Sequence, residues 1–227
     1  MKSVGVGYGK AILFGEHFVV YDVPAIAAGL ELKTKTTVKD SDKTVIYDKT
    51  LREQILPQDG SPVSRILGII EKALDIEAPV ELMIETQIPL HSGMGSSAAL
   101  SVSMIKALSK HTKAGLDDGE INKLAFECEK LFHKTPSGVD NTVSTYGGLL
   151  WYERQPTPRF EEINSEITLP VVLANTGIRH DTGEVVAGVR ERRKANPREY
   201  KQIFSKAQKL VLKAKTAIEG NDLHAVG

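Results

Sequence analysis

The amino-acid sequence predicts an α+β protein, because strand-like and helix-like patterns follow one another along its 227 residues. Short apolar runs broken by glycine, aspartate and proline occupy residues 11–30, which favours strands at the start of the chain. Apolar residues then recur at helical spacing over 64–74. The pattern returns to a strand over 80–86, followed by a glycine and serine loop and a helix over 97–110.

The N-terminal third is predicted to consist mainly of strands, because β-branched and aromatic residues gather in short runs between turn residues. A stretch of alternating threonine and lysine adds a half-exposed strand to this set. The predicted strands cover residues 11–14, 18–21, 25–30, 33–39 and 44–47. The helix over 64–74 follows Ser61 and Pro62, which together form a typical helix start signal.

The C-terminal half is predicted to be mainly helical, with a strand pair near its beginning. Residues 142–153 favour a hairpin or strand pair that bends at Gly147 and Gly148. A short apolar run at 171–174 indicates a buried strand. The predicted helices cover residues 119–132, 184–194 and 199–219.

Composition limits the classes of function. The 29 basic and 29 acidic residues cancel, which argues against a nucleic-acid binder and favours a small anion held at a local site. No apolar run approaches the ~20 residues that span a bilayer, and the first residues lack a signal-peptide pattern. We therefore expect a cytoplasmic protein that binds neither nucleic acid nor membrane. Cys128, the one cysteine, is expected to be a buried structural thiol.

The segment PLHSGMGSSAAL, residues 89–100, has the composition of an anion-binding helix start. Gly93 and Gly95 allow the backbone to approach a phosphate closely, and the first N–H groups of the following helix favour negative charge. Ser96 and Ser97 can cap that helix, and one hydroxyl is a candidate Mg²⁺ ligand. The lysine of the Walker motif is absent. On the loop alone, a plain capped helix start is an equally good interpretation.

Charged residues elsewhere supply candidates for chemistry. Asp140 follows a Pro-Ser-Gly turn, where its carboxylate either accepts a proton from an alcohol or belongs to an ordinary surface turn. Glu129, on the preceding helix, is either an Mg²⁺ ligand or a solvated helix residue. Lys10, Glu16 and His17 surround an apolar tight turn, which favours a polar pocket because isolated charges are costly among apolar side chains.

Three sequence blocks together resemble the GHMP family of small-molecule kinases. The first block, GKAILFGEHFVVYDVPAIA at 9–27, is close to the N-terminal pattern of the family. The second block, PLHSGMGSSAALS at 89–101, is close to the family's phosphate loop. The third block, TPSGVDNTVSTYGG at 135–148, is the most discriminating, and it is similar to the branch that phosphorylates mevalonate.

The resemblance implies a phosphoryl transfer that uses ATP and Mg²⁺, and it implies a role for each candidate residue. Asp140 matches the catalytic base, and Lys10 matches the lysine that orients the acceptor hydroxyl. Ser97 and Glu129 match the metal ligands. The other matches are the substrate-binding residues Glu16, His17 and Thr182 and the loop over the ATP phosphates, Ser92, Gly93, Met94, Gly95, Ser96 and Ser97.

The resemblance also implies a two-lobed fold. Residues 1–165 match an N-terminal mixed α/β domain that carries the ATP and substrate loops, and residues 166–227 match the start of a ferredoxin-like C-terminal domain. A further glycine-rich block of the family has no counterpart in these 227 residues, so we expect an incomplete C-terminal domain and a C-terminally truncated chain. A homodimer fits the family.

The expected reaction is the transfer of the terminal phosphate of ATP to the C5 hydroxyl of mevalonate, which gives 5-phosphomevalonate in isoprenoid biosynthesis. One alternative is another member of the family, which phosphorylates phosphomevalonate, the mevalonate 3-hydroxyl or a sugar. The missing glycine-rich block motivates a second alternative, a catalytically silent relative that only binds the ligand.

Overall fold

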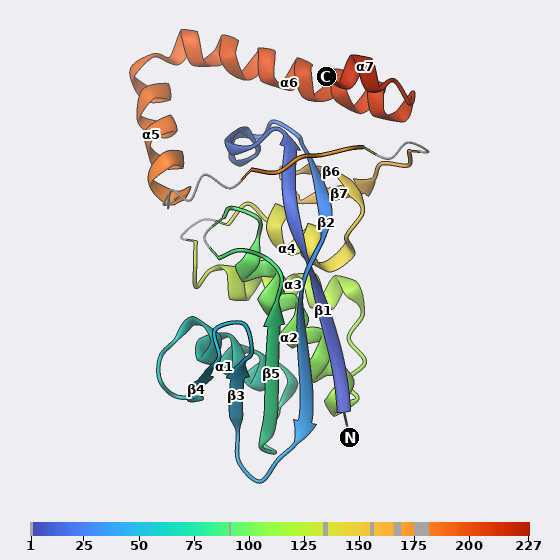
Figure 1. Ribbon diagram of the computed structural model, residues 1–227. Coiled ribbons are helices and arrows are strands. Elements are labelled where there is room, and N and C mark those ends of the chain that lie inside the picture. Colours follow the sequence, from blue (N-terminus) through green and yellow to red (C-terminus); the bar gives the residue numbers. More distant parts are fainter. Residues whose placement is uncertain (1, 91, 134–135, 155–156, 166–168, 175–181) are drawn as a thin grey trace. The chain divides into compact units, whose positions relative to one another are not determined.

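The computed structural model describes residues 2–90, 92–133, 136–154, 157–165, 169–174 and 182–227 (Figure 1). The chain forms two compact units, each built from segments that are distant in the sequence. The first unit comprises residues 1–10, 29–136 and 140–147, and the second comprises 11–28, 137–139 and 148–227. The boundary expected at residue 165 stays a prediction.

The first unit contains a mixed sheet. Strand β2 (Ala25–Asp40) pairs with β1 (Lys2–Phe14), and its C-terminal half pairs antiparallel with β5 (Val80–Thr86). Strand β3 (Val45–Asp48) joins β5 in parallel, and β4 (Glu53–Ile55) pairs antiparallel with β3. The mixture of parallel and antiparallel strands beside helices confirms the expected α+β class.

Helices pack with this sheet to form the core of the first unit. They are α1 (Pro62–Leu74), α2 (Ser96–Thr112), α3 (Asp118–Glu129) and, from Asp140 onward, α4 (Val139–Tyr146). Helix α2 packs against both α1 and α3, and its buried residues extend over most of its surface. The core combines apolar side chains of the strands and helices, among them Val38, Ile46, Leu67, Leu82, Val102, Ile105 and Cys128. Cys128 is fully buried, as expected.

Glycines in β1 allow α2 to lie directly against the strand. A Cβ atom added at Gly7 would lie 2.2 Å from the carbonyl oxygen of Ala99, and one at Gly5 would lie 2.1 Å from that of Ser103. Both contacts are far below van der Waals distance, so only glycine fits at these positions. The close packing fixes α2 beside the strand that carries Lys10.

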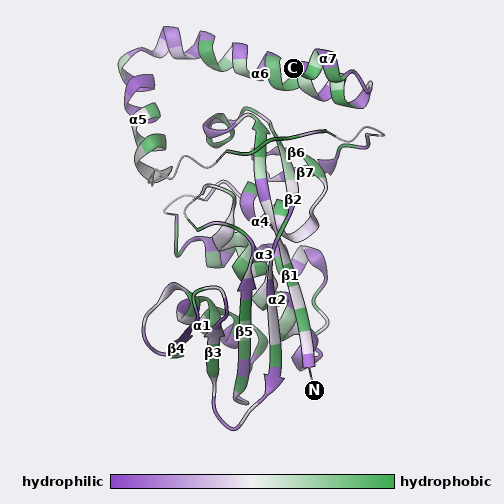
Figure 2. Ribbon diagram, in the orientation of Figure 1, coloured by the Kyte–Doolittle hydropathy of each residue, from purple (hydrophilic) through white to green (hydrophobic). Residues whose placement is uncertain are grey.

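The second unit contains its own strand pairs and helices. The first residues of β2 pair antiparallel with β6 (Leu149–Glu153), and β6 pairs antiparallel with β7 (Arg159–Glu162). The helices of this unit are the 3-10 helix η1 (His17–Tyr21), α5 (Thr182–Ala195), α6 (Pro197–Glu219) and α7 (Leu223–Val226). Figure 2 shows polar and apolar residues alternating along α6. The buried residues of α6, Val211, Ala214 and Ile218, pack with Val23, Ile26, Trp151 and Ile163.

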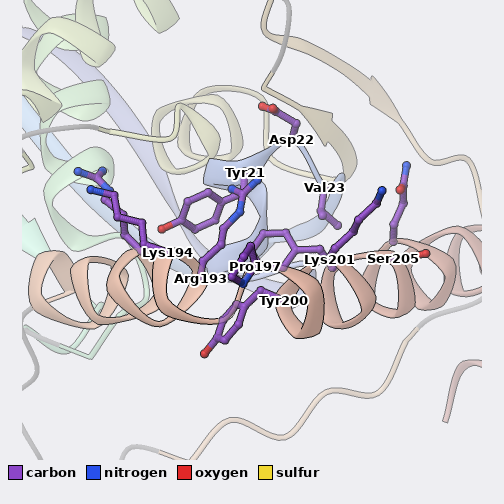
Figure 3. A pocket seen from close by; sticks show the side chains of 12 residues that line it. Tyr21, Asp22, Val23, Arg193, Lys194, Pro197, Tyr200, Lys201 and Ser205 are labelled. Atoms are coloured by element: carbon purple, nitrogen blue, oxygen red, sulfur yellow. The ribbon is translucent and has the colours of Figure 1, made fainter.

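An aromatic cluster joins η1 to α5 and α6 within the second unit. The guanidinium of Arg193 lies 5.0 Å from the ring centroids of both Tyr21 and Phe204. A groove beside this contact is lined by Tyr21, Asp22, Val23 and by residues of α5 and α6 (Figure 3). The basic side chains that line the groove are exposed.

Some predicted elements were wrong. Residues 18–21 belong to η1 rather than a strand, and the segment ends at Asp22 in the left-handed conformation, which stops extended pairing. Residues 142–146 belong to α4 rather than to a strand, because the burial of side chains such as Val143 and Thr145 in the helix overrides the β propensity of valine and threonine. The run 171–174 forms no strand, and Val172 is 95% exposed.

In the described part of the chain, every helix is too short or too polar to cross a membrane.

Candidate active site

The glycine and serine loop leads into α2 with an open helix start. Gly93 and Gly95 have φ angles of 74° and 71°, a region that disfavours side-chain-bearing residues. Gly95 is the N-cap of α2, and among the described residues the helix start has no side-chain cap hydrogen bond. The first turn therefore presents backbone donors and the positive end of the helix dipole to any ligand at the loop.

Lys10 is fixed against this loop. Its backbone N–H donates to the Met94 carbonyl at 2.9 Å. Its aliphatic chain packs on Gly95, where an added Cβ would lie 2.8 Å from the Lys10 Cγ atom. The residue is 8% exposed, so its ammonium group is placed beside the loop in a largely desolvated position. A buried cation of this kind needs an anionic partner.

That partner is Asp140. The Lys10 Nζ atom lies 3.1 Å from Oδ1 of Asp140, and the side chain of Asp140 is 25% exposed. Asp140 lies in the first turn of α4, where the helix dipole favours a negative charge. The carboxylate is therefore held by a cation on one side and remains accessible to a ligand.

Glu129 ends α3 and is only 1% exposed. Burial and, after it, the negative charge of Asp140 raise the pKa of Glu129 to about 8, while a hydrogen bond with Ser97 and the charge of Lys10 act in the opposite direction. Within the described residues, Oε1 of Glu129 has no hydrogen-bond partner. A buried carboxylate oxygen without a partner is unfavourable unless a ligand such as a cation satisfies it.

The side chains present fit a divalent cation. The nearest ligand atoms of Glu129, His133 and Asp140 all lie within 4.8 Å of one another. The Ser97 hydroxyl, through its bond with Glu129, adds a further oxygen donor, and oxygen donors are what Mg²⁺ prefers. His133 lies with Nε2 3.7 Å from Oε2 of Glu129. The sequence did not identify His133, which lies just past the end of α3 and whose backbone N–H donates to the Glu129 carbonyl at 3.0 Å.

The first unit thus brings together a subset of the predicted site residues, namely Lys10, Gly93, Met94, Gly95, Ser97, Glu129 and Asp140. Ser92 lies in the loop and Ser96 begins α2, and both are half-buried. The Ser92 hydroxyl donates to the Pro89 carbonyl at 2.7 Å. Glu16 and His17 belong to the second unit, and both are exposed. Thr182 begins α5, and its side chain lies outside the described part of the structure. The substrate roles of these three residues stay predictions.

Comparisons with known proteins match both the sequence and the fold. A family model described as the GHMP kinases N terminal domain matches residues 62–148. The chain is 33% identical to the mevalonate kinase of Pyrococcus furiosus, over 97% of this chain and 71% of that relative. It is 36% identical to the mevalonate kinase of Pyrococcus horikoshii, over 92% of this chain and 67% of that relative. The crystal structure of L. major mevalonate kinase in complex with R-mevalonate superposes with a TM-score of 0.83 at 29% identity, and covers 99% of this chain and 71% of that one.

The match to the family model includes the glycine and serine loop together with Glu129 and Asp140, whose ligand atoms lie close together in the first unit. The similarity to the Pyrococcus proteins extends further, over 97% and 92% of this chain. The chain belongs to the mevalonate kinase branch of the GHMP kinase family.

Proposed function

We propose that the protein transfers the terminal phosphate of ATP to the C5 hydroxyl of mevalonate, giving 5-phosphomevalonate and ADP. The observation that carries this proposal is the Lys10 and Asp140 pair, with 3.1 Å between its charged atoms, beside the open N-terminus of α2. A carboxylate, a cation and a phosphate-binding helix start are the parts that phosphoryl transfer to an alcohol needs.

Asp140 is the proposed proton acceptor. As the acceptor oxygen forms its bond to the terminal phosphorus, the bond from that phosphorus to the bridging oxygen of ADP breaks. The proton of the hydroxyl passes to the Asp140 carboxylate, and the bridging oxygen leaves with its electron pair on ADP. Lys10, with Nζ 3.1 Å from Oδ1, orients the carboxylate toward the hydroxyl before transfer.

The loop of residues 92–97 is the proposed site of the ATP phosphates. Its open N–H groups and the dipole of α2 favour the phosphate charges without any lysine in the loop itself. Lys10, packed on Gly95, supplies the positive charge that a Walker motif carries within the loop. The ammonium group thus lies between the loop and the carboxylate, where negative charge develops on the transferred group.

Ser97 and Glu129 are the proposed ligands of Mg²⁺, and Asp140 lies within reach of the same cation. When bound with ATP, Mg²⁺ neutralises phosphate charge and fixes the orientation of the terminal phosphate. The unpartnered Oε1 atom of Glu129 supports this assignment, because the chain itself leaves it unsatisfied.

Mevalonate is the proposed acceptor because relatives that match more than nine-tenths of this chain are named mevalonate kinases and one related structure contains R-mevalonate. Glu16, His17 and Thr182 are proposed to contact this substrate, on the strength of the sequence resemblance alone. A homodimer and a cytoplasmic location also stay predictions from the sequence.

A coupled assay of ADP release with mevalonate, phosphomevalonate and galactose as separate acceptors tests the proposal. We expect turnover that depends on mevalonate and on MgATP. Turnover with another acceptor in place of mevalonate would replace the proposed substrate. Binding of mevalonate and ATP, measured by calorimetry, without any ADP release would instead support a silent binding relative.

A further inference from the structure

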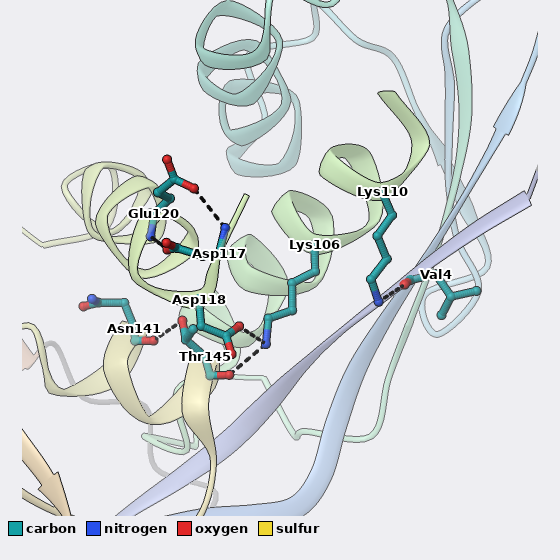
Figure 4. Close-up of polar contacts among 8 residues, drawn as sticks. All are labelled: Val4, Lys106, Lys110, Asp117, Asp118, Glu120, Asn141 and Thr145. Atoms are coloured by element: carbon teal, nitrogen blue, oxygen red, sulfur yellow. Dashed lines mark hydrogen bonds and ion pairs between the residues drawn. The ribbon is translucent and has the colours of Figure 1, made fainter. Parts of the chain in front are cut away.

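Lys106 lies in α2, away from the loop that begins the helix, and its ammonium group joins α2 to two other helices (Figure 4). The Nζ atom donates to the backbone carbonyl of Thr145 at 2.8 Å, and it lies 3.1 Å from Oδ1 of Asp118. The Lys106 side chain is 17% exposed. A largely buried lysine with two anchored contacts is held in one geometry.

Each contact of Lys106 lies at the opposite end of a helix from a candidate active-site residue. Thr145 lies in the last turn of α4, which carries Asp140 in its first turn. Asp118 begins α3, which ends at Glu129. Helix α2 itself begins beside Ser97. One ammonium group therefore connects the three helices that present the proposed base and the proposed metal ligands.

The electrostatics of both contacts are favourable. The carbonyls in the last turn of a helix have no partner within the helix, and a cation there complements the helix dipole. Lys106 provides this cation to α4, while Asp118 lies in the first turn of α3, where a negative charge is favoured. The contacts thus fix the position of α4 along its axis, relative to α2 and α3.

A second group of hydrogen bonds holds α4 to α3 independently of Lys106. The Asn141 side-chain amide donates to Oδ1 of Asn122 at 2.5 Å, and the Asn122 amide donates to the Thr142 hydroxyl at 3.3 Å. These bonds remain when Lys106 is replaced. Loss of Lys106 should therefore let α4 tilt about these retained bonds rather than unfold, and Asp140, in the same rigid helix, changes its orientation as Thr145 moves.

We propose that Lys106 is a positioning residue, which sets the position of Asp140 relative to Glu129 and Ser97 by holding the far end of α4. The expected loss of kcat in a Lys106 variant rests on the proposed function. The structural consequence, a change in the Lys10 to Asp140 distance, is independent of the substrate. Lys106 touches neither the proposed phosphate loop nor the proposed metal ligands in the described residues, so its effect is transmitted through helix position.

The kinetic test compares Lys106→Met with Lys110→Met. Lys110 lies one turn further along α2, and its ammonium group also donates to a backbone carbonyl, that of Val4 in β1, at 3.2 Å (Figure 4). We expect Lys106→Met to lower kcat by about 10- to 100-fold with KM values within about threefold, because misplaced catalytic groups cost rate. Lys110→Met should leave kcat within about twofold of the unsubstituted protein, since it removes a single exposed contact. Equal kcat values for the two variants would overturn the proposal.

Two further variants separate positioning from a general loss of stability. Lys106→Arg keeps a cation and N–H donors, so it should recover most of the lost kcat. Asp118→Asn removes only the partly exposed ion pair, which predicts a loss of about two- to fivefold in kcat and keeps the test available if Lys106→Met does not fold. An unchanged kcat in Asp118→Asn together with no recovery in Lys106→Arg would contradict positioning.

Crystal structures of the unsubstituted and Lys106→Met proteins decide the inference without reference to any substrate. The distance from Lys10 Nζ to Asp140 Oδ1, 3.1 Å here, should lengthen beyond hydrogen-bonding range in the variant. An unchanged distance would overturn the inference. If the unsubstituted protein does not turn over mevalonate, the proposed function fails, while this crystallographic comparison still tests Lys106.

Discussion

The ammonium group of Lys10 lies 3.1 Å from the Asp140 carboxylate, although the two residues are separated by most of the first unit in sequence. The pair is assembled by β1, which reaches the start of α2, and by α4, which presents Asp140 in its first turn. Because Lys10 is buried, the pair is a defined structural feature rather than a surface contact. It is the part of the site on which the proposed reaction depends most directly.

Replacing Asp140 tests the proton acceptor. Asp140→Asn keeps the size of the side chain and removes its basicity, so kcat should fall by about 100- to 10,000-fold. Affinity for ATP, measured by calorimetry, should change little, because the phosphate loop is untouched. Asp42→Asn, in the exposed loop after β2, is the matched control and should keep full activity. Full activity in Asp140→Asn would remove this residue from the proposed role.

The two loop glycines give a matched pair of variants. Both have left-handed φ angles, but an added Cβ would lie 2.8 Å from Lys10 Cγ at Gly95 and would meet none of the described residues within 4 Å at Gly93. Gly93→Ala therefore suffers only backbone strain, whereas Gly95→Ala also displaces Lys10. We expect Gly95→Ala to lower kcat/KM by at least about tenfold more than Gly93→Ala, which corresponds to roughly 1.4 kcal/mol. Similar losses in the two variants would show that contact with Lys10 is unimportant.

The buried Glu129 predicts a stability that depends on pH. Its pKa in the folded protein, about 8, lies above the ordinary value of 4.5, so between these values the folded chain holds a proton that the unfolded chain has lost. The free energy of unfolding should therefore fall as pH rises through this range. Glu129→Gln is neutral at every pH, and its stability relative to the unsubstituted protein should rise by about 2–4 kcal/mol from pH 5 to pH 8.5.

Urea unfolding without added metal, at pH 5, 6.5 and 8.5, measures this difference. Glu127→Gln, an exposed carboxyl on the same helix, is the control and should show no comparable trend. A constant difference between Glu129→Gln and the unsubstituted protein across the three pH values would contradict the raised pKa. Added Mg²⁺ and ATP should reduce the difference, because a cation must displace the proton from Glu129 in order to bind.

Alanine substitutions at two glycines, one at the contact between β1 and α2 and one in α1, should have opposite effects on stability. Gly7→Ala places a Cβ atom 2.2 Å from the Ala99 carbonyl oxygen, so it should destabilise the fold by about 2–3 kcal/mol or more. Gly68→Ala, in α1 with open space around the added atom, should stabilise by about 0.5–1 kcal/mol because alanine is the better helix former. Thermal unfolding of both variants measures the two changes, and a neutral Gly7→Ala would rule out the close packing.

The sequence predicted the strand, loop and helix around residues 89–100 well, because local signals define each element there. Helix α1 begins at Pro62, next to the Ser61 cap that its sequence indicates, and β5 covers Val80–Thr86 as predicted. The extent of β1 was underestimated. Its glycines weaken the strand signal, yet Gly5 and Gly7 are needed because α2 approaches the strand closely.

The environment of the candidate site depended on tertiary structure. Glu129 has the sequence context of a solvated helix residue, and its burial comes from packing at the end of α3, which no local pattern encodes. The contacts of Lys106 likewise join residues from three helices. These contacts depend on how the ends of α3 and α4 are placed beside α2, so sequence periodicity alone could not identify them.

A proton-coupled ³¹P NMR spectrum of the product formed from mevalonate and MgATP tests the proposed phosphorylation site directly. Phosphorylation at C5 places the phosphate beside a methylene group, so we expect a new phosphate-ester triplet together with the signals of ADP. A singlet would place the phosphate on the tertiary C3 oxygen. That result, or the absence of any new phosphate ester from mevalonate, would contradict the proposed function.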